Sequence, residues 1–305
     1  MKLSKGYLID SNDLNLNDLK LIFDRTDEFI KSGNFSDFDY LKNVPIALAF
    51  FENSTRTKLS FELAAKRLNA HVLDFNSDTS SLTKGETHLD TIRTLEAMGV
   101  KIFVVRHKED GLHKFLQNNT NNIIINAGEG ESDHPTQGLL DSYTLKNHFG
   151  SPKGVNLCIV GDVLHSRVAR SNLILLKKQG VNISLTAPKE LLPKDDLIKG
   201  LTIYKDLDEA IDNVDVVMLL RVQKERMKSE LIKSTEEYHS KFGMNIKRYE
   251  RKPELIIMHP GPVNYGVELD EKVILYPNCL IQNQVKYGLY IRMAVLSLLS
   301  DYIKR

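Results

Sequence analysis

Three hydroxyl side chains and one arginine stand together near residue 55 and suggest a phosphate site. The residues are Ser54, Thr55, Arg56 and Thr57, which follow the apolar run 46–51 and precede leucines with helical spacing. They would therefore lie at a helix N-terminus, where free backbone N–H groups and the helix dipole favour an anion. Arg56 can add a forked pair of charge-assisted hydrogen bonds. On this segment alone, an ordinary Ser/Thr helix cap beside a surface arginine is the alternative.

The elements that must position this segment alternate between strand-like apolar runs and helical patterns. Such alternation is typical of a parallel sheet wrapped by helices. A turn-rich stretch at residues 150–154 separates two such series and indicates an interdomain hinge. The sequence thus predicts an α/β chain with two doubly wound parallel-sheet domains. Its strand-like runs are residues 46–51, 72–75, 101–105 and 123–125, then 155–160, 181–185, 214–220 and 255–258.

Two helices near the ends of the chain complete this outline. From Leu16 onward, apolar residues recur at helical spacing and predict an amphipathic helix that ends at Gly33. Residues 284–303 predict a last helix that is apolar on much of its surface and must pack against other elements. We expect a first domain of residues 1–149, a second of residues 150–283, and a C-terminal helix, 284–305, that packs back on the first domain.

Composition limits the classes of function. The chain has 305 residues, enough for two α/β domains, and its 41 Lys and Arg nearly balance its 40 Asp and Glu. This balance argues against nucleic acid or an anionic membrane as a partner. The N-terminal residues lack the apolar core of a signal peptide, and no apolar run approaches the roughly 20 residues needed to span a bilayer. We therefore expect a cytoplasmic protein.

The two cysteines do not indicate a chemical role. Cys158 and Cys279 lie in apolar, strand-like contexts and lack the spacing of metal ligands. We expect both to be core thiols, and we expect neither a bound metal nor a cofactor.

Cations gather in the loops that follow the predicted strands. In doubly wound sheets ligands sit beyond the carboxyl ends of the strands, so these loops are where chemistry is expected. A single arginine after a strand is usually a solvated surface residue, but several together indicate a site for a polyanion. The cations are Arg56, Lys84, Arg106, His134, Arg167 and Arg221.

A dinucleotide-binding domain is the natural alternative, because Gly161 ends a strand-like run in the second series. That fold needs the glycines of G-x-G-x-x-G so that the backbone can approach a pyrophosphate. Residues 161–167 read Gly-Asp-Val-Leu-His-Ser-Arg and lack the later glycines. The segment therefore argues against a Rossmann dehydrogenase.

Three segments resemble a known family of transferases. Residues 54–62, Ser-Thr-Arg-Thr-Lys-Leu-Ser-Phe-Glu, resemble the carbamoyl phosphate motif of the aspartate/ornithine carbamoyltransferases. Both branches of that family share this motif, so it does not separate them. Residues 134–137, His-Pro-Thr-Gln, and 221–226, Arg-Val-Gln-Lys-Glu-Arg, resemble the bacterial-type aspartate branch.

The features of the ornithine branch are missing. Ornithine carbamoyltransferases usually carry cysteine at the third place of the His-Pro motif, where this chain has Thr136. They also carry a Ser-Met-Gly signature, whereas residues 97–99 read Ala-Met-Gly. The charges agree, because the two carboxylates of aspartate need cations such as Arg167 and Arg221, whereas ornithine would need an acid.

The resemblance implies a reaction and a site in the cleft between the two domains. Members of this branch transfer the carbamoyl group of carbamoyl phosphate to the α-amine of L-aspartate, giving N-carbamoyl-L-aspartate and phosphate in de novo pyrimidine biosynthesis. Such members need no metal or cofactor. The first domain would bind carbamoyl phosphate and the second would bind aspartate.

Roles for individual residues also follow from the resemblance. The catalytic set would be Arg56, Thr57, Arg106, His134 and Gln137. Carbamoyl phosphate would contact these five together with Ser54, Thr55, Ser81, Lys84, Gly261 and Pro262, and aspartate would contact Lys84, Arg167, Arg221 and Gln223.

The loop with Ser81 and Lys84 has two interpretations. Taken by itself, it is a polar loop with a solvated lysine. By resemblance it reaches the active site of a neighbouring subunit, which implies a homotrimer with shared active sites. Regulatory chains or other pathway enzymes are further partners that the family makes possible.

Two rival functions stay open at this stage. One is ornithine carbamoyltransferase, and the other is a catalytically silent relative that binds carbamoyl phosphate without turnover. The chain also departs from the expected pattern, with Lys108 in place of proline, Glu129 in place of aspartate and Tyr265 in place of arginine. Loss of a cation at Tyr265, near the substrate loop, would change aspartate affinity or loop closure.

Overall fold

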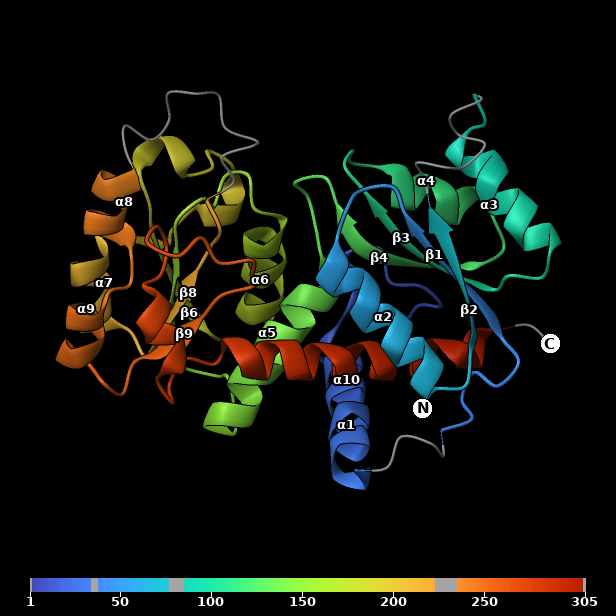
Figure 1. The fold of residues 1–305 in the computed structure, drawn as a ribbon, viewed down its shortest axis with the longest axis horizontal. Coiled ribbons are helices and arrows are strands. Elements are labelled where there is room, and N and C mark those ends of the chain that lie inside the picture. Colours follow the sequence, from blue (N-terminus) through green and yellow to red (C-terminus); the bar gives the residue numbers. More distant parts are fainter. Residues whose placement is uncertain (1, 34–37, 77–84, 223–234, 304–305) are drawn as a thin grey trace. The chain divides into compact units, whose positions relative to one another are not determined.

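The chain folds into two compact units, each built on its own sheet (Figure 1). The computed structural model describes residues 2–33, 38–76, 85–222 and 235–303. Ser81, Lys84 and Gln223 lie outside these residues. The first unit comprises Met1–Leu140 with Lys286–Arg305, and the second comprises Asp141–Val285.

The first unit contains a four-stranded parallel sheet with the order β2-β1-β3-β4. The central strands are continuous apolar runs, as expected when both faces of a parallel sheet are covered. Helix α2 packs against β1 and β2, and α4 packs against β4. The elements are β1 (Pro45–Phe50), α2 (Thr55–Arg67), β2 (His71–Asn76), α3 (His88–Ala97), β3 (Ile102–His107), α4 (Leu112–Asn119) and β4 (Ile123–Glu129).

The predicted opening helix is confirmed as α1 (Leu16–Ser32), preceded by a 3-10 turn, η1 (Ser11–Asp13). It begins with a capping box, in which Asn15 and Asp18 exchange side-chain and backbone hydrogen bonds. It ends at Gly33, whose φ of 61° lies in the left-handed region that glycine adopts readily.

The second unit contains a five-stranded parallel sheet with the order β7-β6-β5-β8-β9. Its strands are β5 (Asn156–Val160), β6 (Asn182–Thr186), β7 (Thr202–Tyr204), β8 (Val216–Leu219) and β9 (Ile256–Met258). Its helices are α6 (Arg167–Lys178), α7 (Leu207–Asn213), α8 (Thr235–Phe242) and α9 (Ile246–Arg251), with 3-10 turns η4 (Lys189–Leu191), η5 (Asp196–Ile198) and η6 (Glu271–Leu275).

Strand β7 was missed by the sequence pattern. It pairs with β6 at the edge of the sheet, Ser184 opposite Thr202, and its first two residues are exposed. A half-solvated edge strand of three residues carries too little apolar pattern to be recognised. The predicted strand 214–220 is also shorter in the structure, because Val214 caps the end of α7.

Two long helices contain residues of both units. Helix α5 (Pro135–Phe149) continues through the division after Leu140, whereas the sequence suggested a boundary at residues 149 and 150. Helix α10 runs over Ile281–Leu299, earlier at both ends than the expected 284–303, and a 3-10 turn, η7 (Ser300–Tyr302), follows it. Its residues from Lys286 onward belong to the first unit.

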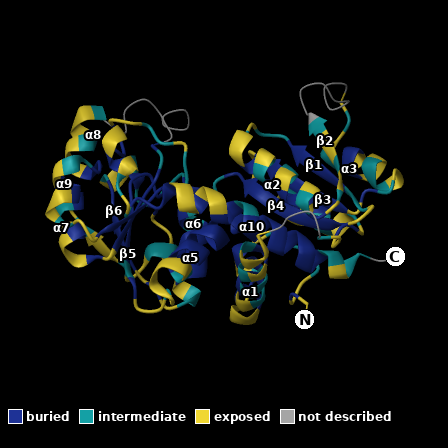
Figure 2. Cartoon of the chain, turned by 60° about the horizontal axis from the view of Figure 1, so that its bottom comes forward, coloured by how far each residue is buried: buried dark blue, intermediate teal, exposed yellow. Residues whose placement is uncertain are grey.

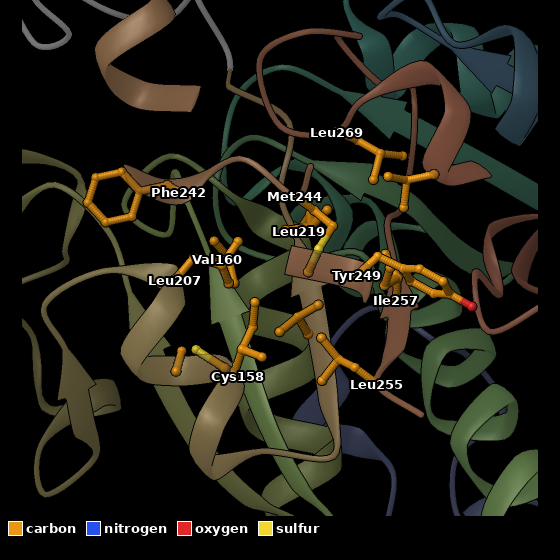
Figure 3. Packing of buried hydrophobic residues seen from close by; sticks show 14 of the residues in the cluster. Cys158, Val160, Leu207, Leu219, Phe242, Met244, Tyr249, Leu255, Ile257 and Leu269 are labelled. Carbon is orange, nitrogen blue, oxygen red and sulfur yellow. The ribbon is translucent and has the colours of Figure 1, made fainter. Parts of the chain in front are cut away.

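The core of the second unit is apolar and includes both cysteines. Strands β5, β6, β8 and β9 are largely buried, whereas helices such as α7 and α9 expose one side (Figure 2). Figure 3 shows one cluster, in which Cys158 and Val160 of β5 pack with Leu219 and Ile257. Burial raises the pKa of the Cys158 thiol to about 12, so it stays protonated. The expectation of core thiols is confirmed.

Candidate active site

In the first unit the candidate residues lie where the order of strands reverses. From β1 the chain moves to β2 on one side, and it then continues at β3 on the other side. Ligands of doubly wound sheets bind beyond the carboxyl ends of strands at such a point. Residues 54–57 follow β1, and Arg106 lies in β3 directly opposite Phe50. The topology thus brings together two segments that are about fifty residues apart in the chain.

The start of α2 has the features of an anion site. Ser54 is the N-cap residue, but its side chain makes no capping hydrogen bond, and the first turn has no acidic residue. The backbone N–H of Lys58 donates to the Ser54 carbonyl at 3.1 Å, which closes the first turn of α2. Thr55 and Arg56 are exposed, whereas Thr57 is buried. The ordinary side-chain cap is therefore not used by Ser54, and its hydroxyl can serve a ligand.

Arg106 is held by contacts that the sequence did not reveal. Its Nε lies 3.1 Å from Glu52 Oε2, and its Nη1 donates to the carbonyl oxygen of Ala127 at 3.1 Å. The backbone N–H of Phe51 donates to the Arg106 carbonyl at 2.9 Å. These contacts set the guanidinium beside the segment that leads into α2. Glu52 stands two residues before Ser54, but nothing in its local pattern marks it as a partner of Arg106.

His134 and Gln137 lie at the beginning of α5. The carbonyl of His134 accepts hydrogen bonds from the N–H groups of Gln137 and Gly138, at 2.9 and 3.2 Å, and Pro135 is the first helical residue. Both side chains are buried. Asp133 Oδ1 accepts from the His134 N–H at 2.8 Å and from the Ser11 hydroxyl at 2.7 Å. Asp133 was not predicted as a site residue, although it ties the His134 loop to the N-terminal segment.

A buried carboxylate supports the neighbouring loop. Glu129, at the end of β4, accepts from the N–H groups of Gly111 and His113 at 2.9 and 3.1 Å, and its Oε1 lies 2.8 Å from His113 Nδ1. Burial by itself would raise the pKa of Glu129. The hydrogen bond and charge of His113, with the two N–H groups, outweigh burial and hold this pKa below its ordinary value.

The second unit repeats the arrangement with different residues. Its strand order reverses between β5 and β8, which are neighbours, and the Leu220 N–H donates to the Val160 carbonyl at 2.8 Å. Arg167, which is buried, is the first residue of α6 after β5, and Arg221 follows β8. Two arginines thus stand after adjacent strands at the position where a ligand is expected.

The segments that lead to these residues are fixed by local hydrogen bonds. Ser166 caps α6, and its hydroxyl accepts from the Ala169 N–H at 3.1 Å. In the loop after β9, His259 Nδ1 accepts from the Gly261 N–H at 2.8 Å, and Gln284 Oε1 accepts from the His259 N–H at 3.0 Å. Gly261 and Pro262 are therefore held by a histidine that was not predicted as part of the site.

The structure divides the predicted site residues between the two units. Ser54, Thr55, Arg56, Thr57, Arg106, His134 and Gln137 belong to the first unit, and Arg167, Arg221, Gly261 and Pro262 belong to the second. Among the described residues, no group of three or more His, Cys, Asp and Glu could hold a metal ion. Within the same residues, no helix has both the length and the apolar character needed to cross a membrane.

Two family domain models together match most of the chain. The family model "Aspartate/ornithine carbamoyltransferase, carbamoyl-P binding domain" matches residues 7–147, and "Aspartate/ornithine carbamoyltransferase, Asp/Orn binding domain" matches residues 153–299. The chain belongs to the aspartate/ornithine carbamoyltransferase family. The resemblance seen in residues 54–62 is thereby confirmed.

Curated relatives narrow the branch of the family. The chain is 44% identical over 307 residues to a protein named aspartate carbamoyltransferase catalytic subunit from Christiangramia forsetii, covering 100% of this chain and 99% of that one. It is also 44% identical to the protein of the same name from Maricaulis maris, over 98% of this chain and 95% of the relative.

Solved structures show the same fold. Aspartate transcarbamoylase from Trypanosoma cruzi, in complex with carbamoyl aspartate and phosphate, matches with a TM-score of 0.87 and 31% identity over 97% of this chain and 96% of that one. The catalytic subunit of M. jannaschii aspartate transcarbamoylase matches with a TM-score of 0.86 and 33% identity over 97% and 98%. The predicted α/β class with two parallel sheets is confirmed.

Proposed function

We propose that this protein transfers the carbamoyl group of carbamoyl phosphate to the α-amine of L-aspartate, the carbamoylation step of de novo pyrimidine biosynthesis. One observation carries the proposal: in each unit, predicted anion-binding residues lie at or just beyond the carboxyl ends of the strands where the strand order reverses. Membership in the aspartate/ornithine carbamoyltransferase family, with relatives named for the aspartate reaction, agrees with this placement.

The first unit binds the phosphate of carbamoyl phosphate. The hydroxyls of Ser54, Thr55 and Thr57 and the N–H groups of the first turn of α2 donate to its oxygens. Arg56 adds a charged fork, and Arg106 bridges the phosphate to the carbamoyl oxygen. Glu52 and Ala127 hold Arg106, so little ordering is needed when substrate binds.

Catalysis consists of positioning and charge stabilisation. The aspartate amine attacks the carbamoyl carbon, and negative charge grows on the carbamoyl oxygen of a tetrahedral intermediate. Thr57, Arg106 and His134 donate to that oxygen, each worth a few kcal/mol in comparable sites. The departing phosphate accepts the amine proton, so the protein need not supply a nucleophile or a separate base.

Other groups recognise the carbamoyl NH₂ and the second substrate. Gln137 and the carbonyls of Gly261 and Pro262 accept the NH₂ protons. The carboxylates of aspartate pair with Arg167 and Arg221, and the sequence assigns Gln223 and Lys84 to the same substrate. Ornithine is rejected because its side-chain ammonium would face these cations.

The assembly is part of the proposal. The family resemblance of the loop with Ser81 and Lys84 supports a homotrimer in which each active site uses residues of two chains. Its substrates, products and charge balance suit a cytoplasmic enzyme. Relatives are named as catalytic subunits, which is consistent with additional regulatory chains.

A colorimetric assay for carbamoyl amino acids tests the function. The protein is given carbamoyl phosphate with either L-aspartate or L-ornithine in separate reactions. We expect a product with aspartate and none with ornithine. A product with ornithine alone would assign the protein to the other branch, and no product with either would identify a silent relative.

A further inference from the structure

A buried glutamate in the second unit is not used by the proposed reaction. Glu268 is only 1% exposed, although an ionised carboxylate is costly to bury. Its two oxygens accept hydrogen bonds from the N–H of Val222, the N–H of Asn264 and the side-chain amide of Asn264, at 2.7, 2.7 and 2.8 Å. The carboxylate thus has one partner in the segment after β8 and one in the segment after β9.

These partners are adjacent to residues assigned to the substrates. Val222 directly follows Arg221, and Asn264 stands two residues after Pro262. The Asn264 amide also donates to the Val222 carbonyl at 3.3 Å. Both backbone polar groups of Val222 are therefore bound by the pair Glu268 and Asn264. Val222 and Glu268 are 46 residues apart in the chain. The Glu268 carboxylate nevertheless joins the segment after Arg221 to the segment after the Gly261–Pro262 turn.

The burial of Glu268 favours a role other than stability. Burial raises its pKa, although the hydrogen bonds from Val222 and Asn264 work in the opposite direction. Within the described residues, its ionisable neighbours include His259, whose Nε2 lies 4.0 Å from Oε2, and the buried phenol of Tyr238. Burial thus disfavours the charged form of a carboxylate whose hydrogen-bond donors favour it. Such groups often serve function at the expense of stability.

We propose that Glu268 is a positioning residue for this reaction. It holds the backbone after Arg221 against the turn that carries the Gly261 and Pro262 carbonyls, so that the aspartate-binding guanidinium and the carbamoyl-binding carbonyls keep one geometry. This inference rests on the proposed function. Glu268 itself touches neither substrate.

The substitution Glu268→Gln tests this role with little change of shape. A glutamine has one acceptor oxygen and one NH₂ donor, so one of the N–H groups of Val222 and Asn264 would face another donor. We expect the KM for aspartate to rise about tenfold and kcat to fall. Binding of inorganic phosphate, measured at equilibrium, should change less than twofold, because the phosphate residues belong to the first unit. A substitution that merely weakened the fold would not produce this split.

A second variant tests the same hydrogen-bond network in case Glu268→Gln does not fold. Asn264→Ala removes the amide that bonds Glu268 Oε1 and the Val222 carbonyl but leaves the carboxylate in place. It should raise the KM for aspartate in the same direction. If both residues act through one network, the double variant should be only slightly worse than the worse single variant.

A matched control separates position from charge. Asp208→Asn removes a carboxylate of the same unit that pairs with Arg248 and Arg251 and, in the part of the chain that the structure describes, contacts neither substrate segment. It should leave both kinetic constants near those of the wild type.

The outcomes distinguish the two claims. If the wild type does not carbamoylate aspartate, the proposed function is wrong. If the wild type is active, an unchanged aspartate KM in folded Glu268→Gln or Asn264→Ala would overturn the positioning role, as would fully additive effects in the double variant.

Discussion

At the scale of single residues, the candidate cations differ in how far they are buried. Arg56 is exposed at the start of α2, whereas Arg106 and Arg167 are buried. A buried guanidinium must be paired to be tolerated, and Arg106 has Glu52 and the Ala127 carbonyl. Arg56 lies in the first turn of α2, where an anion is favoured. We therefore propose that Arg106 orients carbamoyl phosphate and that Arg56 captures its phosphate.

Replacement of Arg56 tests this assignment. Arg56→Ala should weaken equilibrium binding of carbamoyl phosphate more than tenfold, because hydrogen bonds to charged groups contribute about 1.5–3 kcal/mol. Turnover should nearly disappear while the melting temperature stays close to that of the wild type. Lys66→Ala, which removes a surface ion pair with Glu62 on the same helix, is the control and should bind normally. Near-normal affinity in Arg56→Ala would refute the phosphate site.

The second unit offers a parallel test with the other substrate. Arg167→Ala and Arg221→Ala should each raise the KM for aspartate more than tenfold, with little change in equilibrium binding of carbamoyl phosphate. Arg170→Ala is the matched control, since Arg170 lies on α6 with Arg167 and pairs with Asp195 at 3.0 Å. If either test variant bound carbamoyl phosphate poorly but responded normally to aspartate, the division of the two substrates would be wrong.

At the scale of elements, helix ends and strand ends do most of the positioning. Helices α2, α5 and α6 each begin within a few residues of a predicted site residue. Glu129 connects a strand end to a helix start, because its carboxylate at the end of β4 accepts hydrogen bonds from the N–H groups of Gly111 and His113 at the start of α4. A carboxylate at a helix N-terminus also interacts favourably with the helix dipole.

The pH dependence of stability should show this connection. The folded-state pKa of Glu129 lies below its reference value of 4.5, so its stabilising effect is present above that value and is lost as the pH falls through the folded-state pKa. Glu129→Gln should therefore be less stable than the wild type at pH 7, and the difference should shrink below pH 4.5. Denaturant unfolding of both proteins at several pH values measures this difference in the free energy of unfolding.

Glu268→Gln should show the opposite pH dependence of stability, because the pKa of Glu268 is raised whereas that of Glu129 is lowered. The pKa of Glu268 is raised above 4.5, so its contribution to stability is greatest below that value and decreases as the pH rises through the folded-state pKa. The stability of the wild type relative to Glu268→Gln should therefore fall as the pH rises. The same slope in both variants would contradict the opposite pKa shifts.

At the scale of the whole molecule, the proposal concerns how chains share active sites. Lys84 lies outside the described residues, and its role rests on the family resemblance. If it acts on a neighbouring subunit, inactive Lys84→Ala and Arg56→Ala chains should complement each other in mixed trimers. Random assembly of equal amounts places about three quarters of the trimers in the mixed class, each with one intact site in three, so recovery near a quarter of wild-type activity is expected.

The experiment requires that the two variants be dissociated, mixed and reassembled, with mass analysis to count mixed oligomers. Each parent protein, taken through the same treatment alone, is the control. A preparation rich in mixed trimers that remains as inactive as its parents would show that Lys84 serves its own chain or none.

The sequence by itself determined the class of fold, the family and most of the candidate residues. Buried strands and amphipathic helices can be predicted from the local sequence, because burial dictates which side chains are apolar and at what spacing. The helix from Leu16 to Gly33 and the motif before α2 were readable for this reason. Charge in loops after strands was readable as well, since parallel strands all end at one edge of their sheet.

Only the tertiary structure decided which residues support the site. Asp133 accepts a hydrogen bond from Ser11, which is 122 residues away in the sequence, and Glu268 accepts one from Val222, which is 46 residues away. The tertiary structure also placed residues of both units on α5, which the local turn at residues 150–154 did not suggest. A buried polar group must find a hydrogen-bond partner, but any donor or acceptor brought near by the fold can satisfy it. Local sequence therefore shows that a partner is needed, and only the packed chain determines which residue it is.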